Sequence, residues 1–145
     1  MNNVIIRKAD FSDIARVLEI EQENIISWTY NQFVEEIGRS FSVFIVAEND
    51  GIIAGYAVAW IIADELQLNS IAVKNSCKKR GIGSLLLQNL LTGSRAQNIH
   101  VILIDVRSKN VEAVNFYKKN GFHETGRRPN YYGDDDAILM EKKIR

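Results

Sequence analysis

A basic turn with two glycines leads from a short apolar strand into a leucine-rich segment within residues 71–84. Three cations are followed in this turn by two glycines: Lys78, Lys79, Arg80, Gly81 and Gly83. Glycine adopts positive φ angles without strain and lets a ligand approach the backbone closely. A helix that starts near Ile82 adds free N–H groups and the positive end of its dipole. These features predict a site for a phosphate or diphosphate group.

Two stricter phosphate motifs do not match this turn. Leu86 stands where the dinucleotide fingerprint requires its third glycine, and no Gly-Lys-Ser/Thr run follows as a P-loop requires. The remaining pattern resembles the acetyl-coenzyme A (acetyl-CoA) site of the GNAT superfamily of N-acetyltransferases. Lys78 departs from the Arg or Gln that is usual there, and its ammonium group binds phosphate without the planar fork of Arg.

A second segment, residues 110–122, makes the resemblance specific. It reproduces the other signature of the family at five fixed positions: Asn110, Ala113, Tyr117, Gly121 and Phe122. With each residue type near ~5% usage, five such positions match by chance in about 1 in 20,000 chains of this length. Chance therefore does not explain the match.

Hydrophobic periodicity and turn residues predict the elements that position these segments. Strands are expected at residues 4–7, 41–48, 52–61, 66–73, 100–107, 122–126 and 137–144. Helices are expected at residues 10–23, 29–37, 82–96 and 110–120. Asn49-Asp50-Gly51 is typical of a hairpin turn. The third helix is expected to bury Leu85, Leu86, Leu90 and Leu91.

The first helix has an apolar face made of Ile14, Val17, Leu18 and Ile25. Asp10 is expected to cap its N-terminus. Glu21 falls on or beside the apolar face, which is unusual for a carboxylate unless it borders a cleft.

The order of the predicted elements is that of the GNAT fold, so the resemblance covers essentially the whole chain as a single domain, residues 1–145. It implies an α/β fold of the mixed, α+β kind. The central sheet is mostly antiparallel, with helices on both of its faces. The resemblance also implies that the strands ending at Val73 and Arg107 splay apart and leave a V-shaped gap for the pantetheine arm.

The resemblance also implies which residues hold the cofactor. Main-chain groups of Ile71, Ala72 and Val73 pair with the pantetheine arm, and the N–H group of Val73 faces the oxyanion. The diphosphate is held by residues of the turn and the start of the helix, namely Arg80, Gly81, Ile82, Gly83 and Ser84. Lys78 and Lys79 add positive charge. Asn110 reaches the arm or its carbonyl end.

Acetyl transfer from a thioester to an amine needs a neutral amine, a stabilised oxyanion and a proton for the departing thiolate. Asp105 lies toward the C-terminal end of a strand whose even positions are largely apolar, and α/β sites tend to form at such ends. A carboxylate desolvated beside an apolar strand becomes a stronger base. We expect Asp105 to act as the general base through a water molecule; the alternative is that it caps the loop or pairs with Arg107.

Tyr117 occupies the tyrosine of the second signature. Aromatic residues at helical spacing usually belong to the core, which is the alternative for Tyr117. The resemblance implies that its phenol lies near the cofactor sulfur and acts as the general acid.

Further segments resemble the bacterial ribosomal-protein alanine N-acetyltransferases and their N-terminal-acetylating relatives. They are Ile20-Glu21-Gln22, Trp28, Val106-Arg107 before a Ser-x-Asn, Arg128, Asn130-Tyr131-Tyr132 and Asp136-Ala137-Ile138. That subgroup usually has Glu where this chain has Asp105. The resemblance gives acceptor-binding roles to five residues, with Glu21 attracting the ammonium group: Glu21, Trp28, Arg128, Tyr131 and Tyr132. For the loop tyrosines the alternative is a solvated surface turn, and solvated charges are what we expect of the neighbouring Asp134, Asp135 and Asp136.

Composition narrows the classes of partner. Eighteen basic and eighteen acidic residues give zero formal net charge, which disfavours direct binding to nucleic acid or to an anionic membrane. No signal peptide or membrane-spanning run is visible, so a cytoplasmic location is expected. Cys77 is the only cysteine, and the two histidines lack metal-ligand spacing, so neither a disulfide nor a metal is expected.

The function expected from the resemblance is direct transfer of acetyl from acetyl-CoA to the α-amine of a protein or peptide N-terminus, for which a ribosomal protein is a candidate. An α-amine has a reference pKa of about 7.7–8.0, so a modest base suffices. Two alternatives remain: acetylation of a small amine on the same scaffold, and a CoA-binding module without catalysis. The chain is expected to be a monomer or a homodimer.

Overall fold

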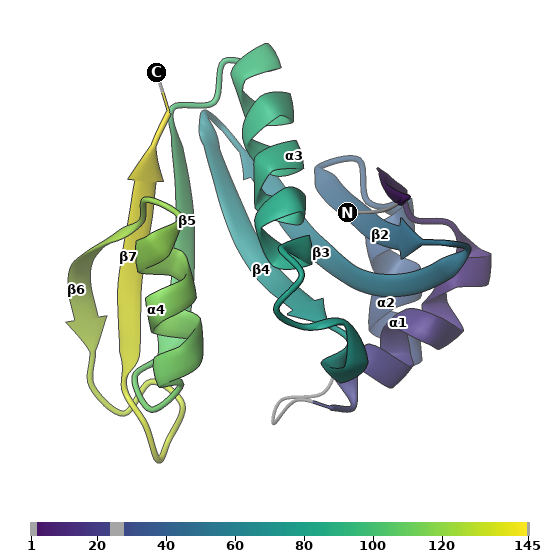
Figure 1. Ribbon diagram of the computed structural model, residues 1–145. Helices are drawn as coiled ribbons and strands as arrows, with labels where there is room; N and C mark the ends of the chain where they lie inside the picture. The colour runs from purple at the N-terminus through teal and green to yellow at the C-terminus, as the bar shows by residue number, and fades with distance from the viewer. Residues whose placement is uncertain (1–2, 24–27, 145) are drawn as a thin grey trace.

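The computed structural model describes residues 3–23 and 28–144, which form one seven-stranded sheet with helices on both faces (Figure 1). The strands are β1 (Val4–Lys8), β2 (Ser42–Asn49), β3 (Ile52–Ile62), β4 (Glu65–Val73), β5 (Val101–Arg107), β6 (His123–Arg128) and β7 (Ala137–Lys143). The helices are α1 (Ile14–Glu21), α2 (Tyr30–Gly38), α3 (Ile82–Ala96) and α4 (Val111–Lys119), with short 3-10 helices at Phe11–Asp13 and Asn75–Cys77. This is the element order that the sequence predicts.

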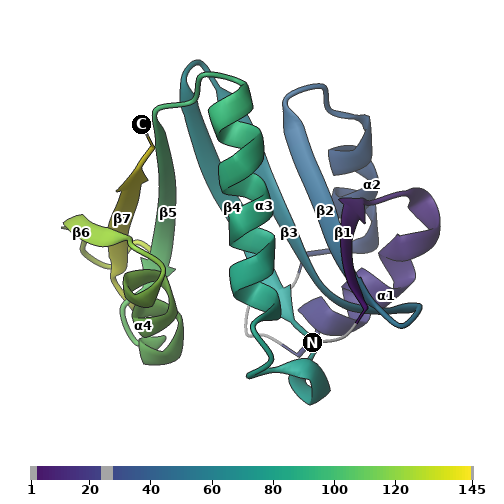
Figure 2. The same cartoon turned by 45° about the horizontal axis from the view of Figure 1, so that its top comes forward.

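The sheet has the strand order β1-β2-β3-β4-β5-β7-β6. Its neighbouring strands are antiparallel except for β4 and β5, which run parallel. The parallel pairing covers three residue pairs and ends where Gln67 lies opposite Leu103. Beyond that pair the two strands separate, as Figures 1 and 2 show. The predicted V-shaped splay is confirmed.

A bulge in β4 lies just past the last parallel pair. Val58 of β3 pairs with Ser70, whereas Ala59 pairs with Leu68, so Asn69 is an extra residue in β4. Bulges bend a strand and increase its twist. The bulge therefore helps to turn the end of β4 away from β5.

Two hydrophobic cores lie on opposite faces of the sheet. On one face α1 and α2 cover a core that includes Val17, Phe33 and Tyr56, all fully buried. On the other face α3 and α4 contribute residues such as Leu86 and Tyr117 to the larger core. Figure 2 shows α3 and α4 on the same side of the sheet, on either side of the gap between β4 and β5.

Helix α3 has the predicted bounds, but one of its predicted core positions is wrong. Leu85 is 36% exposed, whereas Leu87 is buried with Leu86, Leu90 and Leu91. The helix advances 100° per residue, so the buried face that also includes Ser94 places position 87 toward the sheet and position 85 toward solvent.

Local signals in the sequence are largely confirmed. Asp10 caps a 3-10 turn that precedes α1, in a reciprocal pair with Asp13. Asp50 and Gly51 both have positive φ in the turn between β2 and β3. The predicted apolar position Ile25 lies outside the described residues.

Candidate active site

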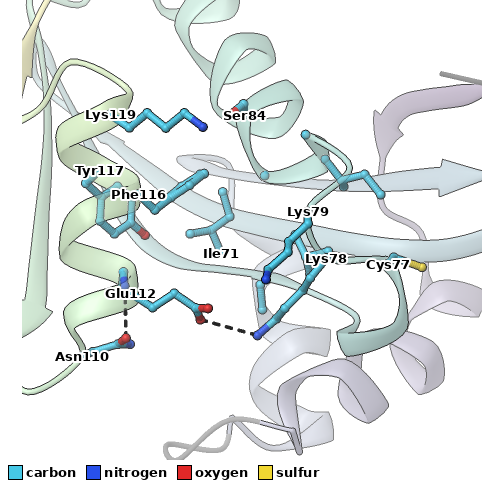
Figure 3. A pocket seen from close by; sticks show the side chains of 16 residues that line it. Ile71, Cys77, Lys78, Lys79, Ser84, Asn110, Glu112, Phe116, Tyr117 and Lys119 are labelled. Carbon is cyan, nitrogen blue, oxygen red and sulfur yellow. Dashed lines mark hydrogen bonds and ion pairs between the residues drawn. The ribbon is translucent and has the colours of Figure 1, made fainter.

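A cleft of about 350 Å³ opens between the end of β4, the turn before α3 and the inner face of α4 (Figure 3). It is lined by ten of the eleven residues that the sequence assigns to the cofactor: Ile71, Ala72, Val73, Lys78, Lys79, Gly81, Ile82, Gly83, Ser84 and Asn110. Tyr117 lines the same cleft. Arg80 is exposed and is not among the lining residues. The fold thus brings two distant sequence segments together around one hollow.

The two glycines of the turn serve different purposes. Gly81 is the N-cap of α3 and has a φ of 79°, a left-handed conformation that favours glycine. At Gly83, an added Cβ would lie 3.0 Å from Cζ of Phe116 on α4, so this glycine permits the two helices to approach closely. The first helical hydrogen bond runs from the Leu85 N–H to the Gly81 carbonyl, so the preceding N–H groups are available to an anion.

The end of β4 presents an unpaired backbone edge to the cleft. Residues 71–73 pair with β3 on one side, where Val73 lies opposite Gly55. On the other side the pairing with β5 has already ended at Gln67. A ligand with amide groups can therefore bind this edge as an added strand would.

Lysine side chains give the cleft a positive lining. Besides Lys78 and Lys79, Lys119 of α4 extends into it (Figure 3). Lys78 also makes an exposed ion pair with Glu112 across the cleft, at 3.8 Å. Lys119 was not predicted from the sequence. Helical spacing could have indicated that Lys119 lines the cleft, because it lies three residues after Phe116 and therefore on the same face of α4.

Tyr117 is 4% exposed and packs edge-on against Phe116 and Phe122. Its burial raises the pKa of the phenol above the usual tyrosine value. The phenol therefore stays protonated at neutral pH. Tyr117 is thus part of the core and also lines the cleft, and its role as general acid stays a prediction.

Asp105 lies on β5 with its side chain on the opposite face of the strand from Ile104 and Val106, both buried. The side chain is exposed, so the expected desolvation is not observed. Arg107 does not pair with Asp105; its partner is Asp134, at 3.3 Å.

Two tyrosines of the loop between β6 and β7 lie against arginines at the ends of β5 and β6. The Arg107 guanidinium lies 4.3 Å from the ring centre of Tyr132. The Arg128 guanidinium lies 5.5 Å from the ring centre of Tyr131. The two tyrosine rings meet edge to face. The structure thus brings together Tyr131, Tyr132 and Arg128, to which the resemblance gives a common role, and it adds Arg107.

Asp135 of this loop is not the solvated surface charge that the sequence suggests. It is 5% exposed and accepts hydrogen bonds from the Ser108 hydroxyl at 2.5 Å and the Lys109 N–H at 3.0 Å. These bonds join the β6–β7 loop to the segment that follows β5.

Glu21 lies at the end of α1 and is 3% exposed, so it is not an open carboxylate at the mouth of a cleft. It accepts hydrogen bonds from the Tyr56 hydroxyl and from the Trp28 N–H. Burial raises the pKa of the Glu21 carboxyl. Trp28 stacks on Phe33, at 5.2 Å between ring centres. Tyr56 was not predicted from the sequence.

Residues 9–122 match the family model of the Acetyltransferase (GNAT) family. The chain belongs to this family. The ribosomal protein bS18-alanine N-acetyltransferase of Escherichia coli K12 is 29% identical to it over 96% of this chain and 97% of the relative.

Two crystal structures are similar to this GNAT fold over nearly their whole length. The ribosomal-protein-S18-alanine N-acetyltransferase from Escherichia coli has a TM-score of 0.89 and 27% identity, covering 97% of this chain and 94% of that one. Ard1 from Thermoplasma volcanium has a TM-score of 0.91 and 29% identity, covering 98% of both chains. Membership of the family makes this protein an N-acetyltransferase whose acetyl donor is acetyl-CoA.

A metal-binding cluster and a membrane-spanning helix are both absent from residues 3–23 and 28–144. No group of three or more His, Cys, Asp or Glu side chains is placed to hold a metal ion there. None of the helices described in residues 3–23 and 28–144 is long and apolar enough to cross a membrane.

Proposed function

We propose that this GNAT enzyme acetylates the α-amine of a protein N-terminus by direct transfer from acetyl-CoA. The proposal is supported by similarity to an alanine N-acetyltransferase over nearly the whole chain. The observation that carries it is the cleft, which joins the phosphate-binding turn to the buried phenol of Tyr117. A ribosomal protein is a candidate acceptor, because the E. coli relative is named for ribosomal protein bS18.

The residues of the cleft fit the donor. Its diphosphate is bound by the N–H groups at the start of α3 together with Lys78 and Lys79, and Arg80 adds charge from the rim. Its pantetheine amides pair with the open edge of residues 71–73. The side chain of Asn110 caps α4 by accepting from the Ala113 N–H, which leaves its amide N–H₂ group free to donate to the donor arm.

The chemistry is then divided between two side chains. The amine nitrogen attacks the thioester carbonyl, a C–N bond forms, and the C–S bond breaks. The N–H group of Val73 stabilises the oxyanion, and Tyr117 donates its proton to the departing sulfur and regains one from solvent after CoA leaves. Asp105, which is exposed, takes the amine proton through a water molecule and releases it to solvent.

The acceptor lies on the face of the sheet opposite the donor cleft, between the segment at Trp28 and the β6–β7 loop. Tyr131 and Tyr132 form one wall of its slot. Arg128 lies against Tyr131 and holds that ring in place. Glu21 is buried beneath this surface, so it acts on the acceptor indirectly.

The test is a panel of acceptors incubated with acetyl-CoA and followed by thiol release and peptide mass. It compares a free-amine peptide that begins with Ala, the same peptide acetylated at its N-terminus, and small amines. Acetylation of the free-amine peptide at its α-nitrogen is expected. Turnover only with small amines, or only with blocked peptides that contain lysine, would refute the proposed acceptor.

A further inference from the structure

A chain of three hydrogen-bonded side chains runs from a buried carboxylate to the gap in the sheet. The Tyr56 hydroxyl donates to Oε1 of Glu21, and Oε2 of Glu21 accepts from the Trp28 N–H. The same Tyr56 oxygen lies 2.8 Å from the Ser70 hydroxyl. Tyr56 is fully buried, Glu21 is 3% exposed and Ser70 is partly exposed, so Ser70 is the end of the chain that a substrate can reach.

The carboxylate fixes the direction of every proton in this chain. Because both oxygens of Glu21 accept, the Tyr56 proton points toward Glu21. Tyr56 then has no proton left for Ser70, so Ser70 must be the donor in the bond between them. The lone pairs of Ser70 consequently face away from Tyr56 and can accept from an N–H group in the gap.

Ser70 stands where an acceptor would meet the donor. It lies just past the bulge of β4, three residues beyond the last pair with β5. Alternation along the strand directs Ile71 to the cofactor cleft and Ser70 to the opposite face. Tyr117, the proposed proton donor, lines the cofactor cleft together with Ile71, the next residue of the strand.

We propose that Ser70 binds the acceptor amine as a hydrogen-bond acceptor, and that Tyr56 and Glu21 are positioning residues that set the direction of its hydroxyl. This inference rests on the proposed function, since it takes the α-amine as the group bound. The Ser70 oxygen accepts one N–H of the neutral amine, and the bond strengthens as the nitrogen gains positive charge during attack. No covalent bond to Ser70 forms.

The energetics of the chain favour such a role. Burying a carboxylate costs free energy unless it is well bonded, and a phenylalanine at position 56 would fill the same core volume without requiring it. Buried polar side chains that cost more free energy than apolar replacements would are typical of functional sites.

The main test is Ser70→Ala, with Ser42→Ala as the matched control. Ser42 also donates to a buried carboxylate, at 2.7 Å from Glu36, but that cluster includes Trp60 and lies away from the cleft. We expect Ser70→Ala to lower kcat/KM for the free-amine peptide by about 10- to 100-fold, the usual effect of losing a hydrogen bond to a charged group. The Kd for CoA and the melting temperature should stay near the wild-type values, and Ser42→Ala should leave kcat/KM unchanged.

A double-mutant cycle separates positioning from a merely structural role. Tyr56→Phe alone should lower kcat/KM, whereas in a Ser70→Ala background it should cause no further loss in kcat/KM, because the hydroxyl that it orients is gone. Ser70→Thr, which retains a hydroxyl, should restore activity. Additive losses, or a Ser70→Ala enzyme with wild-type kcat/KM, would overturn the inference and leave the proposed function intact. A wild-type enzyme inactive on every peptide would overturn both.

Discussion

Gly83 at the start of α3 and Phe116 on α4 are in contact across the floor of the cofactor cleft. An added Cβ on Gly83 would lie 3.0 Å from Cζ and 3.1 Å from Cε1 of the Phe116 ring. Both residues line the cleft. The shape of the cleft at the proposed diphosphate site therefore depends on the absence of a side chain at position 83.

Gly83→Ala should weaken CoA binding by about tenfold, because the methyl group displaces Phe116 at an energetic cost typical of overpacking. Calorimetry with CoA measures this change. Gly93→Ala, in the exposed face of the same helix with no atom within 4 Å of its added Cβ, is the control. It should stabilise the fold by about 0.5–1 kcal/mol and leave CoA affinity unchanged. Equal affinity of the Gly83→Ala variant would show that Phe116 moves freely.

Tyr117→Phe should lower kcat by about 100-fold or more, because it removes the proton donor and preserves the ring contacts with Phe116 and Phe122. Steady-state assays with saturating peptide and acetyl-CoA measure the change, and CoA binding should persist. Since burial raises the pKa of this phenol, wild-type activity should not fall at the pH where an ordinary tyrosine ionises. A variant with wild-type kcat would leave Tyr117 only a packing role.

Asp105→Asn should lower kcat by about 10- to 100-fold, because an amide cannot accept the amine proton. Asp105→Glu should retain or increase activity, since its longer side chain reaches further toward the gap. Asp64→Asn, an exposed position in the β3–β4 turn, is the control and should behave as wild type. If Asp105→Asn were fully active, the base would have to be sought elsewhere.

Asp13 should make the stability of the fold depend on pH. The Arg7 guanidinium, which bonds both carboxylate oxygens at 2.8 Å, holds the pKa of Asp13 below its usual value. The pair therefore stabilises the native state above the unfolded-state pKa of Asp, about 3.9, and this stabilisation is lost as pH falls through the lower folded-state pKa.

Asp13→Asn should cost about 2 kcal/mol at neutral pH, less than a fully buried pair because Arg7 is one-third exposed. Urea titrations at neutral and acid pH measure the loss, which should shrink on acidification. Glu19→Gln breaks the exposed pair with Arg16 and should change stability little. A loss that is independent of pH would assign the effect to packing.

Much of this fold could be predicted because its signals are local. The bounds of α3 follow from Gly81 and the leucine pattern, and the β2–β3 turn follows from Asp50-Gly51. The cleft could be predicted as a set of residues, since the two signatures of the family supply it.

Other features depend on contacts between distant residues and left no local pattern. Tyr56 lies 35 positions from Glu21 and 14 positions from Ser70 in the sequence. No local pattern therefore indicated that the three side chains are hydrogen-bonded to one another. The exposure of Asp105 was missed for a related reason. Alternation gave the face of β5 on which it lies but not whether another element covers that face.

The short parallel contact between β4 and β5 has a consequence for the whole molecule. Among the residues described, the strand pairing between the first four strands and the last three runs only from Glu65–Val101 to Gln67–Leu103. In the proposed binding mode, a donor molecule contacts both β4 and α4 and therefore adds contacts between the two halves of the sheet where the strand pairing is short. Acetyl-CoA is then a structural ligand as well as a reactant, and the enzyme should resist thermal unfolding better in its presence.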